Sequence, residues 1–355
     1  MSAPLPRHAD KNKRKRISLQ AVHTASVFIL LVVLCVISMI KTDTFFTWKN
    51  LVYNLLTNAA YLGIIACGMT LVMIAGGFDL SVASTTAVCS VIVVLLLQSL
   101  DRPGAWYTIP AALFGAVLVG IILGSVNGVL VSYVGVNPFV VTLSTMLIFR
   151  GVALVITHGG QTIMVPLVLT NTFRQIYWGR VGLFGSDVYQ LPVPILVFVA
   201  VFIVSFYLLR FTRFGHYIYA VGGNETASWL AGINTSLVKA VTYTITGFTC
   251  AIAAAIYVGM SNTAQAASYQ GLEMLVIASV IVGGTPLGGG RGGLVCTLNG
   301  LLLLAVIENL LAQFGVHEEY RNILRGSIIL IAVTVDVLMR RTRRGRQGDG
   351  KRTFS

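Results

Sequence analysis

Long apolar stretches separated by short polar segments occupy most of this chain. Division at the polar, proline and glycine clusters predicts ten helical spans, over residues 20–40, 51–75, 82–100, 109–134, 138–158, 191–209, 240–260, 272–285, 294–313 and 323–339. About 20 helical residues cross a hydrocarbon layer roughly 30 Å thick. The pattern therefore predicts an all-α integral membrane protein, a polytopic bundle of about eight to ten transmembrane helices. This range allows for the short eighth span and for a break in the second.

The composition agrees with this fold class. Hydrophobic residues make up 56% of the chain and charged residues only 10%, whereas a soluble domain carries about 25% charged residues. The five cysteines lie inside apolar stretches and show no paired spacing. They are therefore interpreted as small core residues rather than as a disulfide framework.

The positive residues are concentrated in three places. The net charge of +13 could indicate nucleic-acid binding, but most of the 25 Lys and Arg residues lie in the head, in the tail and in or beside one polar loop, residues 210–239. Positive residues next to membrane spans remain in the cytoplasm, so this pattern orients the chain. Base-reading modules and interleaved aromatic residues are absent, and we expect no nucleic-acid partner.

The charge pattern also divides the chain. An even number of spans places both termini on one side, and their basic character predicts that this side is the cytoplasm. We therefore expect a basic cytoplasmic head (1–19), a transmembrane domain (20–340) and a basic cytoplasmic tail (341–355). The loop over 210–239 would then be cytoplasmic and the loop over 159–190 would be external.

No group of residues indicates a catalytic centre. The five histidines never fall at metal-ligand spacing, and no nucleophile motif occurs. Residues 288–293 match G-x-G-x-x-G but lie between two apolar spans, and the tail segment 345–352 lacks the Ser or Thr that a phosphate loop needs. We therefore expect no enzyme activity, no metal site and no cofactor in this chain.

Glycine marks two features of the spans. Gly120, Gly124 and Gly128 recur at every fourth residue of the fourth span, which creates a small-residue face that another helix can approach closely. We favour packing within the chain over a dimer contact. Separately, Ile74–Ser81 and Ile281–Gly288 share isoleucine, two glycines and leucine at matching positions, and glycine-interrupted hydrophobic segments in two halves of a membrane protein point to a transport pathway.

We place the pathway beside these two glycine turns. The candidate residues are Gly76, Gly77, Asp79, Ser81, Gly283, Gly284 and Thr285. Asp79 allows two hypotheses. An ionisable group at membrane depth is a functional candidate because burial of an unpaired charge is costly, but an aspartate here could equally cap the helix that starts at Ser81 and fix the turn.

Three motifs carry a resemblance to a known family. They are GMTLVMIAGGFDLSV at residues 68–82, then TRFG, AVGGN and AGIN between residues 212 and 234, and finally ASVIVGGT followed by GGGRG between residues 278 and 292. In order and spacing this set resembles the permeases of ribose, xylose and arabinose-type ABC importers, over about residues 50 to 340. The chain has Ala83 where that family usually has glycine.

The resemblance implies a permease subunit in a bacterial inner membrane. It further implies a periplasmic binding protein that delivers a monosaccharide, a second permease chain in a homodimer or heterodimer, and a separate ATPase subunit that binds the ATP. Since this chain has no usable phosphate loop, the residues agree that the energy must come from another polypeptide.

The loop over 210–239 is the candidate contact with that ATPase. Asn224 is a good N-cap, and Glu225 would lie in the favourable first turn of a short helix over 225–231. The candidate coupling residues are Gly222, Gly223, Asn224, Glu225, Ala227, Ala231 and Gly232.

Two other kinds of transporter remain open. An ion-coupled carrier would need several intramembrane acids, histidines or lysines, and the sequence offers little beyond Asp79 and Glu308. A branched-chain amino acid permease of the same superfamily would differ in the ligand of its binding protein. The residues do not identify the sugar.

Overall fold

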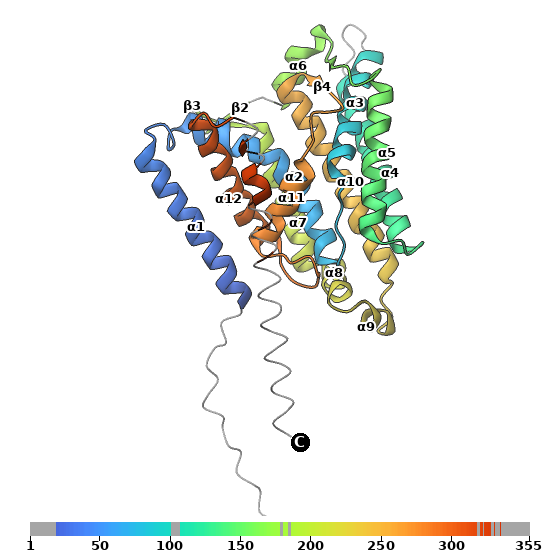
Figure 1. Ribbon diagram of the computed structural model, residues 1–355. Coiled ribbons are helices and arrows are strands. Elements are labelled where there is room, and N and C mark those ends of the chain that lie inside the picture. The colour runs from blue at the N-terminus through green and yellow to red at the C-terminus, as the bar shows by residue number, and fades with distance from the viewer. Residues whose placement is uncertain are drawn as a thin grey trace, which may run out of the picture.

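Figure 1 shows the computed structural model of the 355-residue chain. It describes residues 19–100, 107–177, 180–183, 186–317, 320–321, 323–327, 330 and 334. The predicted cytoplasmic tail, and the predicted head except for its last residue, lie outside these residues.

Helices dominate the described part of the chain. In chain order they are α1 (Leu19–Lys41), the π-helix η1 (Lys49–Leu56), α2 (Thr57–Ile74), α3 (Val82–Ser99), α4 (Thr108–Ser132), α5 (Pro138–Ile156), α6 (Leu167–Tyr177), α7 (Val193–Phe211), α8 (Arg213–Gly223), α9 (Glu225–Leu230), α10 (Thr235–Ser261), α11 (Leu272–Gly283) and α12 (Leu294–Gln313). The first nine predicted spans each coincide with one of these helices, or with η1 and α2 together. The tenth, 323–339, falls largely outside the described residues.

The all-α prediction needs a correction, because the structure contains short strands. They are β1 (Ile163–Met164), β2 (Arg180–Leu183), β3 (Ser186–Pro192) and β4 (Thr263–Ala264), in two antiparallel pairs, β1 with β4 and β2 with β3. Three of them, together with α6, occupy the predicted external loop. This segment is less apolar than the spans around it, so strand pairing provides the backbone partners that a helix would otherwise supply.

Length separates the full spans from shorter apolar segments. In the described residues seven helices, with η1 and α2 counted as one, are long and apolar enough to cross a membrane, whereas α11 (Leu272–Gly283) and the part of α1 over Ala25–Lys41 are shorter. Twelve residues of α11 extend only about 18 Å at 1.5 Å per residue. The predicted eighth span, 272–285, is therefore a short helix, as the sequence analysis allowed. Gly271 (φ +82°) and Gly284 (φ +110°) end the helix on either side, because their backbone is left-handed.

The centre of the bundle is formed around α10, which contacts α2, α3 and α4. The predicted small-residue face of α4 lies at this contact. A Cβ atom added at Gly124 would lie 2.5 Å from the carbonyl oxygen of Tyr243 on α10, and one at Gly128 would lie 2.7 Å from that of Ala240. Gly120 meets Gly247 in the same way. These glycines thus pack within the chain, where backbone touches backbone.

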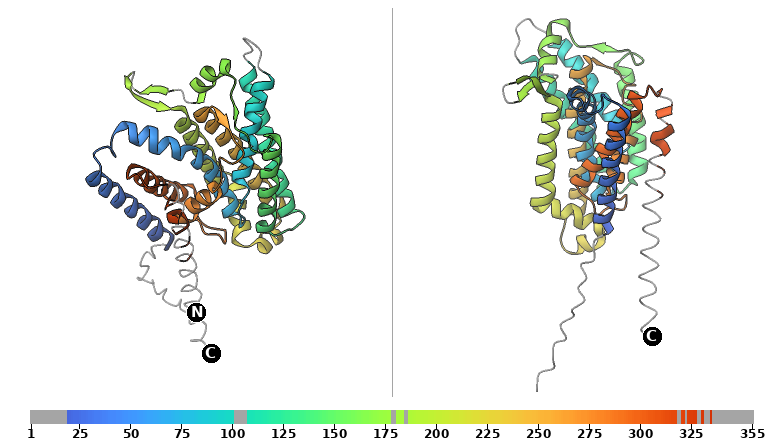
Figure 2. Two further views of the ribbon diagram at one scale, coloured as in Figure 1. Left: turned by 45° about the horizontal axis from the view of Figure 1, so that its top comes forward. Right: turned by 90° about the vertical axis from the view of Figure 1, so that its left-hand side faces the viewer.

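The two ends of the bundle differ. Figures 1 and 2 show α8 and α9 at one end, with the start of α1, and α6, β2 and β3 at the opposite end. The predicted cytoplasmic loop and the predicted external loop therefore lie at opposite ends of the molecule.

The close contact between α4 and α10 predicts a sharp response to one methyl group. Gly124→Ala should destabilise the protein by about 1–3 kcal/mol because the backbone of α10 would have to move, although alanine favours a helix more than glycine does. Gly151→Ala on α5 is the control, since nothing lies within 4 Å of its added Cβ. Thermal unfolding in detergent would measure both, and equal stability of the two variants would contradict the packing described.

Candidate functional site

Three glycine-rich segments meet at the foot of α2. One follows α2, the second ends α8, and the third lies between α11 and α12. We call this contact the glycine junction and define it by Gly76, Gly222, Gly223, Gly289 and Gly290. The first two segments contain candidate residues from the sequence, and the third belongs to the GGGRG motif.

Backbone touches backbone throughout the glycine junction. The N–H of Gly290 donates a hydrogen bond to the carbonyl oxygen of Ile74, the last residue of α2, at 2.8 Å. A Cβ atom at Gly222 would overlap that same oxygen, and one at Gly290 would lie 2.7 Å from Cα of Gly223. Side chains at Gly222, Gly289 and Gly290 would collide with the opposing backbone, so the relative positions of the three segments are fixed by main-chain atoms.

The first glycine turn is held from two sides. Gly76 adopts φ +89°, which L side chains rarely adopt. Gly77 lies under Tyr243, since a Cβ atom there would be 2.6 Å from the tyrosine Oη. That hydroxyl donates to the carbonyl oxygen of Phe78 at 3.1 Å. The turn therefore has its backbone bonded to α10 as well as to the glycine junction.

Asp79 completes this turn with bonds inside the protein. Its Oδ1 accepts from the N–H of Ser81 at 2.8 Å and from the Ser81 hydroxyl at 2.6 Å. Asn127 of α4 donates to the Ser81 Oγ at 2.7 Å and approaches the Asp79 Oδ2 at 3.5 Å. All three residues are buried. These bonds support the turn-fixing hypothesis in modified form, because α3 starts at Val82 and its N-cap is Ser81.

The second glycine turn, Gly283 and Gly284, lies at the end of α11 and outside the glycine junction. A Cβ atom at Gly283 would overlap the carbonyl oxygen of Cys296, so this residue sets the close contact of α11 with α12. Thr285 is buried, and its Oγ1 accepts from the N–H of Gly293 at 3.3 Å. The two predicted turns therefore do not touch through these glycines. The connection runs through Gly289 and Gly290, which follow the second turn and reach the first.

The predicted loop over 210–239 is largely helical. Thr212 caps α8 through Oγ1, which accepts from the N–H of Gly215 at 3.2 Å. Ile218 and Val221 lie one turn apart on α8 and are buried against the foot of α2. The sequence motif contained both signals, a hydroxyl cap and an apolar pair at helical spacing, yet the prediction left these residues in a loop.

The short helix predicted over 225–231 is present as α9 (Glu225–Leu230). Its N-cap is Asn224, whose Oδ1 accepts from the N–H of Ala227 at 2.9 Å, and Glu225 forms a 2.6 Å ion pair with Lys239. Ala231 and Gly232 (φ +84°) follow the helix and are exposed. Trp229 and Leu230 are 64% and 73% exposed, so α9 presents apolar surface at the end of the bundle.

Tyr219 connects α8 to the third glycine segment. Its hydroxyl donates to the carbonyl oxygen of Gly292 at 2.9 Å. Burial raises the pKa of the Tyr219 phenol above its ordinary value, so the group stays protonated and able to donate this bond at neutral pH.

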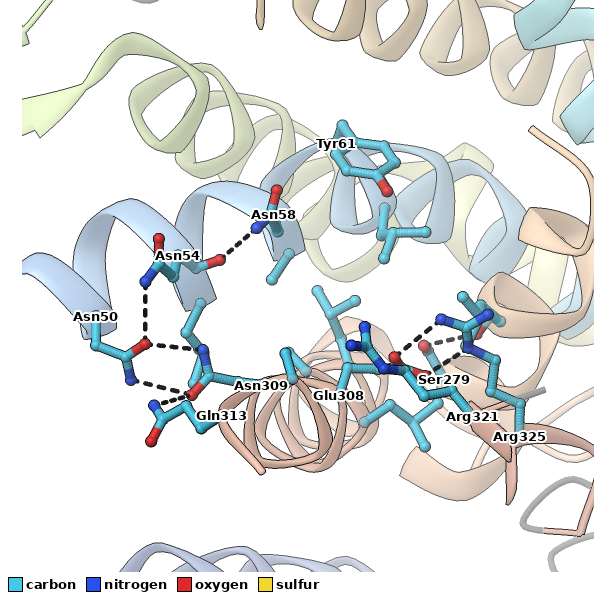
Figure 3. A pocket seen from close by; sticks show the side chains of 18 residues that line it. Asn50, Asn54, Asn58, Tyr61, Ser279, Glu308, Asn309, Gln313, Arg321 and Arg325 are labelled. Carbon is cyan, nitrogen blue, oxygen red and sulfur yellow. Dashed lines mark hydrogen bonds and ion pairs between the residues drawn. The ribbon is translucent and has the colours of Figure 1, made fainter. Parts of the chain in front are cut away.

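A cavity of about 530 Å³ lies between η1, α2, α11, α12 and the segment after α12. Figure 3 shows polar side chains around it: Asn50, Asn54, Asn58, Tyr61, Ser279, Glu308, Asn309, Gln313, Arg321 and Arg325. Because η1 contacts β3, the cavity lies toward the end of the bundle that carries the β2–β3 hairpin. Its size is within the range of small-molecule sites.

A network of amides forms one wall of the cavity. Asn50 of η1 and Asn309 of α12 each donate to the side-chain oxygen of the other at 3.0 Å. Gln313 donates to the Asn309 oxygen at 3.0 Å, and Asn54 donates to the Asn50 oxygen at 3.2 Å. Figure 3 shows these side chains side by side along the cavity.

An ion pair forms the other wall. Arg325 donates to Glu308 through Nε at 2.5 Å and through Nη2 at 2.9 Å. Glu308 is the one acid among the described residues that line the cavity. Its charge is therefore neutralised within the protein.

The sequence analysis missed the amide wall. The signal was a spacing: Asn50, Asn54 and Asn58 recur at every fourth residue at the start of an apolar span. Glu308, Asn309 and Gln313 form a similar polar stripe on α12. Amide side chains are uncharged and these residues belong to no known motif, so a search for catalytic and ionisable groups did not identify them.

Comparison with known proteins gave consistent matches. A family model described as the permease component of branched-chain amino acid transport systems matches residues 51–333. The ribose import permease protein RbsC of Escherichia coli K12 is 36% identical over 311 residues, which is 88% of this chain and 92% of that protein. RbsC of Bacillus subtilis 168 is 36% identical over 335 residues, 92% of this chain and 97% of that protein. The galactose/methyl galactoside import permease protein MglC of Escherichia coli K12 is 30% identical over 334 residues, 91% and 97% of the two chains. No solved structure matches significantly.

We predict that neither glycine turn tolerates a side chain. Gly77→Val would collide with Tyr243, and Gly284→Val would force a branched side chain onto a left-handed backbone. We expect each variant to reach the membrane and to lose uptake. Uptake assays alongside immunodetection of membrane fractions would measure this, with Gly151→Val as the control. Normal uptake by both turn variants would show that the turns are incidental.

Proposed function

We propose that this chain, which belongs to the family of permease components named after branched-chain amino acid transport systems, is the membrane-spanning subunit of an ATP-driven importer for a monosaccharide. A separate ATPase subunit binds and hydrolyses the ATP. A periplasmic binding protein delivers the sugar, and a second permease chain, identical or paired, completes the path. The membrane is the bacterial inner membrane.

The charge distribution supports one orientation in this membrane. Arg210, Arg213 and Lys239 lie beside α8 and α9, and positive residues near span ends stay cytoplasmic. The basic head and tail belong to the same side in this scheme. The end that carries α6, β2 and β3 then faces the binding protein, and the cavity lies toward that end.

The exposed apolar side chains of α9 support an ATPase contact. A six-residue helix with exposed Trp229 and Leu230 at the cytoplasmic end presents a compact surface for a cleft in another protein. Helix α9 is also held rigidly, by the Asn224 cap and by the Glu225–Lys239 ion pair.

The amide wall is the observation that carries the choice of cargo. An amide both donates and accepts hydrogen bonds, as a sugar hydroxyl does, and polar side chains at membrane depth are costly unless they face water or a polar solute. Asn54 and Asn58 are exposed in the cavity. A neutral molecule with many hydroxyls matches this wall.

An amino acid matches the described cavity less well. Its ammonium group would need a carboxylate, and Glu308 is already held by two bonds from Arg325. Removal of that partner from a half-buried pair would be costly. The cavity chemistry thus favours the sugars of the curated relatives over the amino acids in the family description.

The ATPase contact can be tested with one charge. Ala227→Glu places an unpaired carboxylate on the exposed face of α9, and desolvation of that charge in a contact costs several kcal/mol. We expect the variant permease to insert normally, to lose its ATPase subunit on purification and to lose ATP-dependent uptake in proteoliposomes. Gln161→Glu adds the same charge at an exposed position of the opposite end and should leave the ATPase subunit bound on purification. Uptake that needs no ATP and collapses with a proton or sodium ionophore would contradict the proposed function.

The amide wall can be tested with a conservative pair. Asn54→Leu removes one hydrogen-bonding group from the cavity, and we expect uptake at low sugar concentration to fall about threefold to tenfold, the effect of one neutral hydrogen bond. Asn54→Gln keeps an amide and should retain most of the uptake. The substrate is the sugar that the co-purified binding protein holds. Equal uptake by Asn54→Leu and the unmodified chain would show that the amide wall does not bind the transported sugar.

A further inference from the structure

We propose that Tyr219 is a positioning residue that couples movement of α8 and α9 to the glycine turn between α2 and α3. This inference rests on the proposed function, because it assumes that an ATPase moves α9. It concerns a residue outside the cavity and outside the exposed face of α9.

The first support is the place of Tyr219 between the two regions. The residue lies on α8, one turn before the end of the helix at Gly223, and only Asn224 separates α8 from α9. Its side chain turns inward to the carbonyl oxygen of Gly292. The neighbouring Tyr217 points the other way and is 41% exposed. Tyr219 thus bonds α8 to the third glycine segment, and Tyr217 does not.

The second support is how firmly that segment is attached. A Cβ atom at Gly292 (φ +107°) would overlap Oγ1 of Thr285, and the next residue, Gly293, donates to that oxygen. Within the same segment Gly290 donates to Ile74 at the end of α2. Movement of Gly292 is therefore transmitted along the two residues of backbone to Gly290, and from there through its hydrogen bond to the end of α2.

The third support is the lack of side chains in the glycine junction. A contact between side chains can absorb a small movement by a change of rotamer, whereas packed backbone cannot. Gly222 meets the carbonyl of Ile74 directly. A displacement of α8 is consequently passed to the foot of α2, and the Tyr219 hydroxyl keeps the third segment in register while this happens.

The test is the number of sugar molecules taken up per ATP hydrolysed. Tyr219→Phe keeps the ring and removes only the bond to Gly292, so we expect this ratio to fall about fivefold, the scale of one neutral hydrogen bond. The rate of ATP hydrolysis by the assembled complex and its thermal stability should stay close to those of the unmodified protein. Tyr217→Phe makes the same chemical change on the exposed side of α8 and should leave the ratio unchanged.

Three outcomes would overturn the proposal. An unchanged ratio in Tyr219→Phe would show that the bond transmits nothing. Equal losses of ATP hydrolysis, uptake and stability would show a merely structural role. A lowered ratio in Tyr217→Phe as well would remove the specificity for the inward tyrosine. If the unmodified complex showed no ATP-dependent uptake, the proposed function itself would fail first, before any variant is compared.

Discussion

A helix that ends in the packed interior of a protein must find new partners for the carbonyl groups of its last turn, because no water can reach them there. The end of α2 meets this constraint with a main-chain donor from a segment more than 200 residues later, the N–H of Gly290 on the carbonyl of Ile74. Such a partner can approach only because Gly222, Gly289 and Gly290 carry no side chain that would collide with the opposing backbone. The glycines of the three motifs therefore act together in one contact, and this contact positions α3, α8 and α12.

Sequence reasoning identified the parts of this arrangement that depend on local chemistry. Asn224 caps a helix because of its own side chain, and Gly76 forms a turn because of its own backbone freedom. Pairings across the fold were less accessible. The sequence placed a pathway beside two similar glycine turns without showing their contacts: Gly283 packs α11 on α12, whereas Gly289 contacts Gly76 of the first turn. Repetition in a sequence reports similar local geometry and does not report which copies meet.

The cavity illustrates a second limit of the sequence. Asn50 and Asn309 form a reciprocal pair across 259 positions, and neither residue matches a known motif. The short strands were missed for a related reason, since two-residue pairings such as β1 with β4 are created by the helices that bring them together. In both cases the fold determines which residues pair, so local propensity and sequence spacing could not indicate these pairs. The apolar helices, by contrast, follow directly from the solvent, and the first nine predicted spans each coincide with helices in the structure.

The π-helix η1 has an evolutionary consequence. A π-helical turn holds one more residue than an α-helical turn, so η1 is equivalent to an insertion at the start of a membrane helix. Because the π-helical turn absorbs the extra residue, loss of one residue from η1 would restore an α-helix and leave the helix beyond it in register. Only the spacing of the polar side chains within η1, Asn50 and Asn54, would then change, while every remaining residue kept its identity. A deletion is thus the shortest mutational route to a different set of polar groups at this wall, one that residue-by-residue comparison of relatives would overlook.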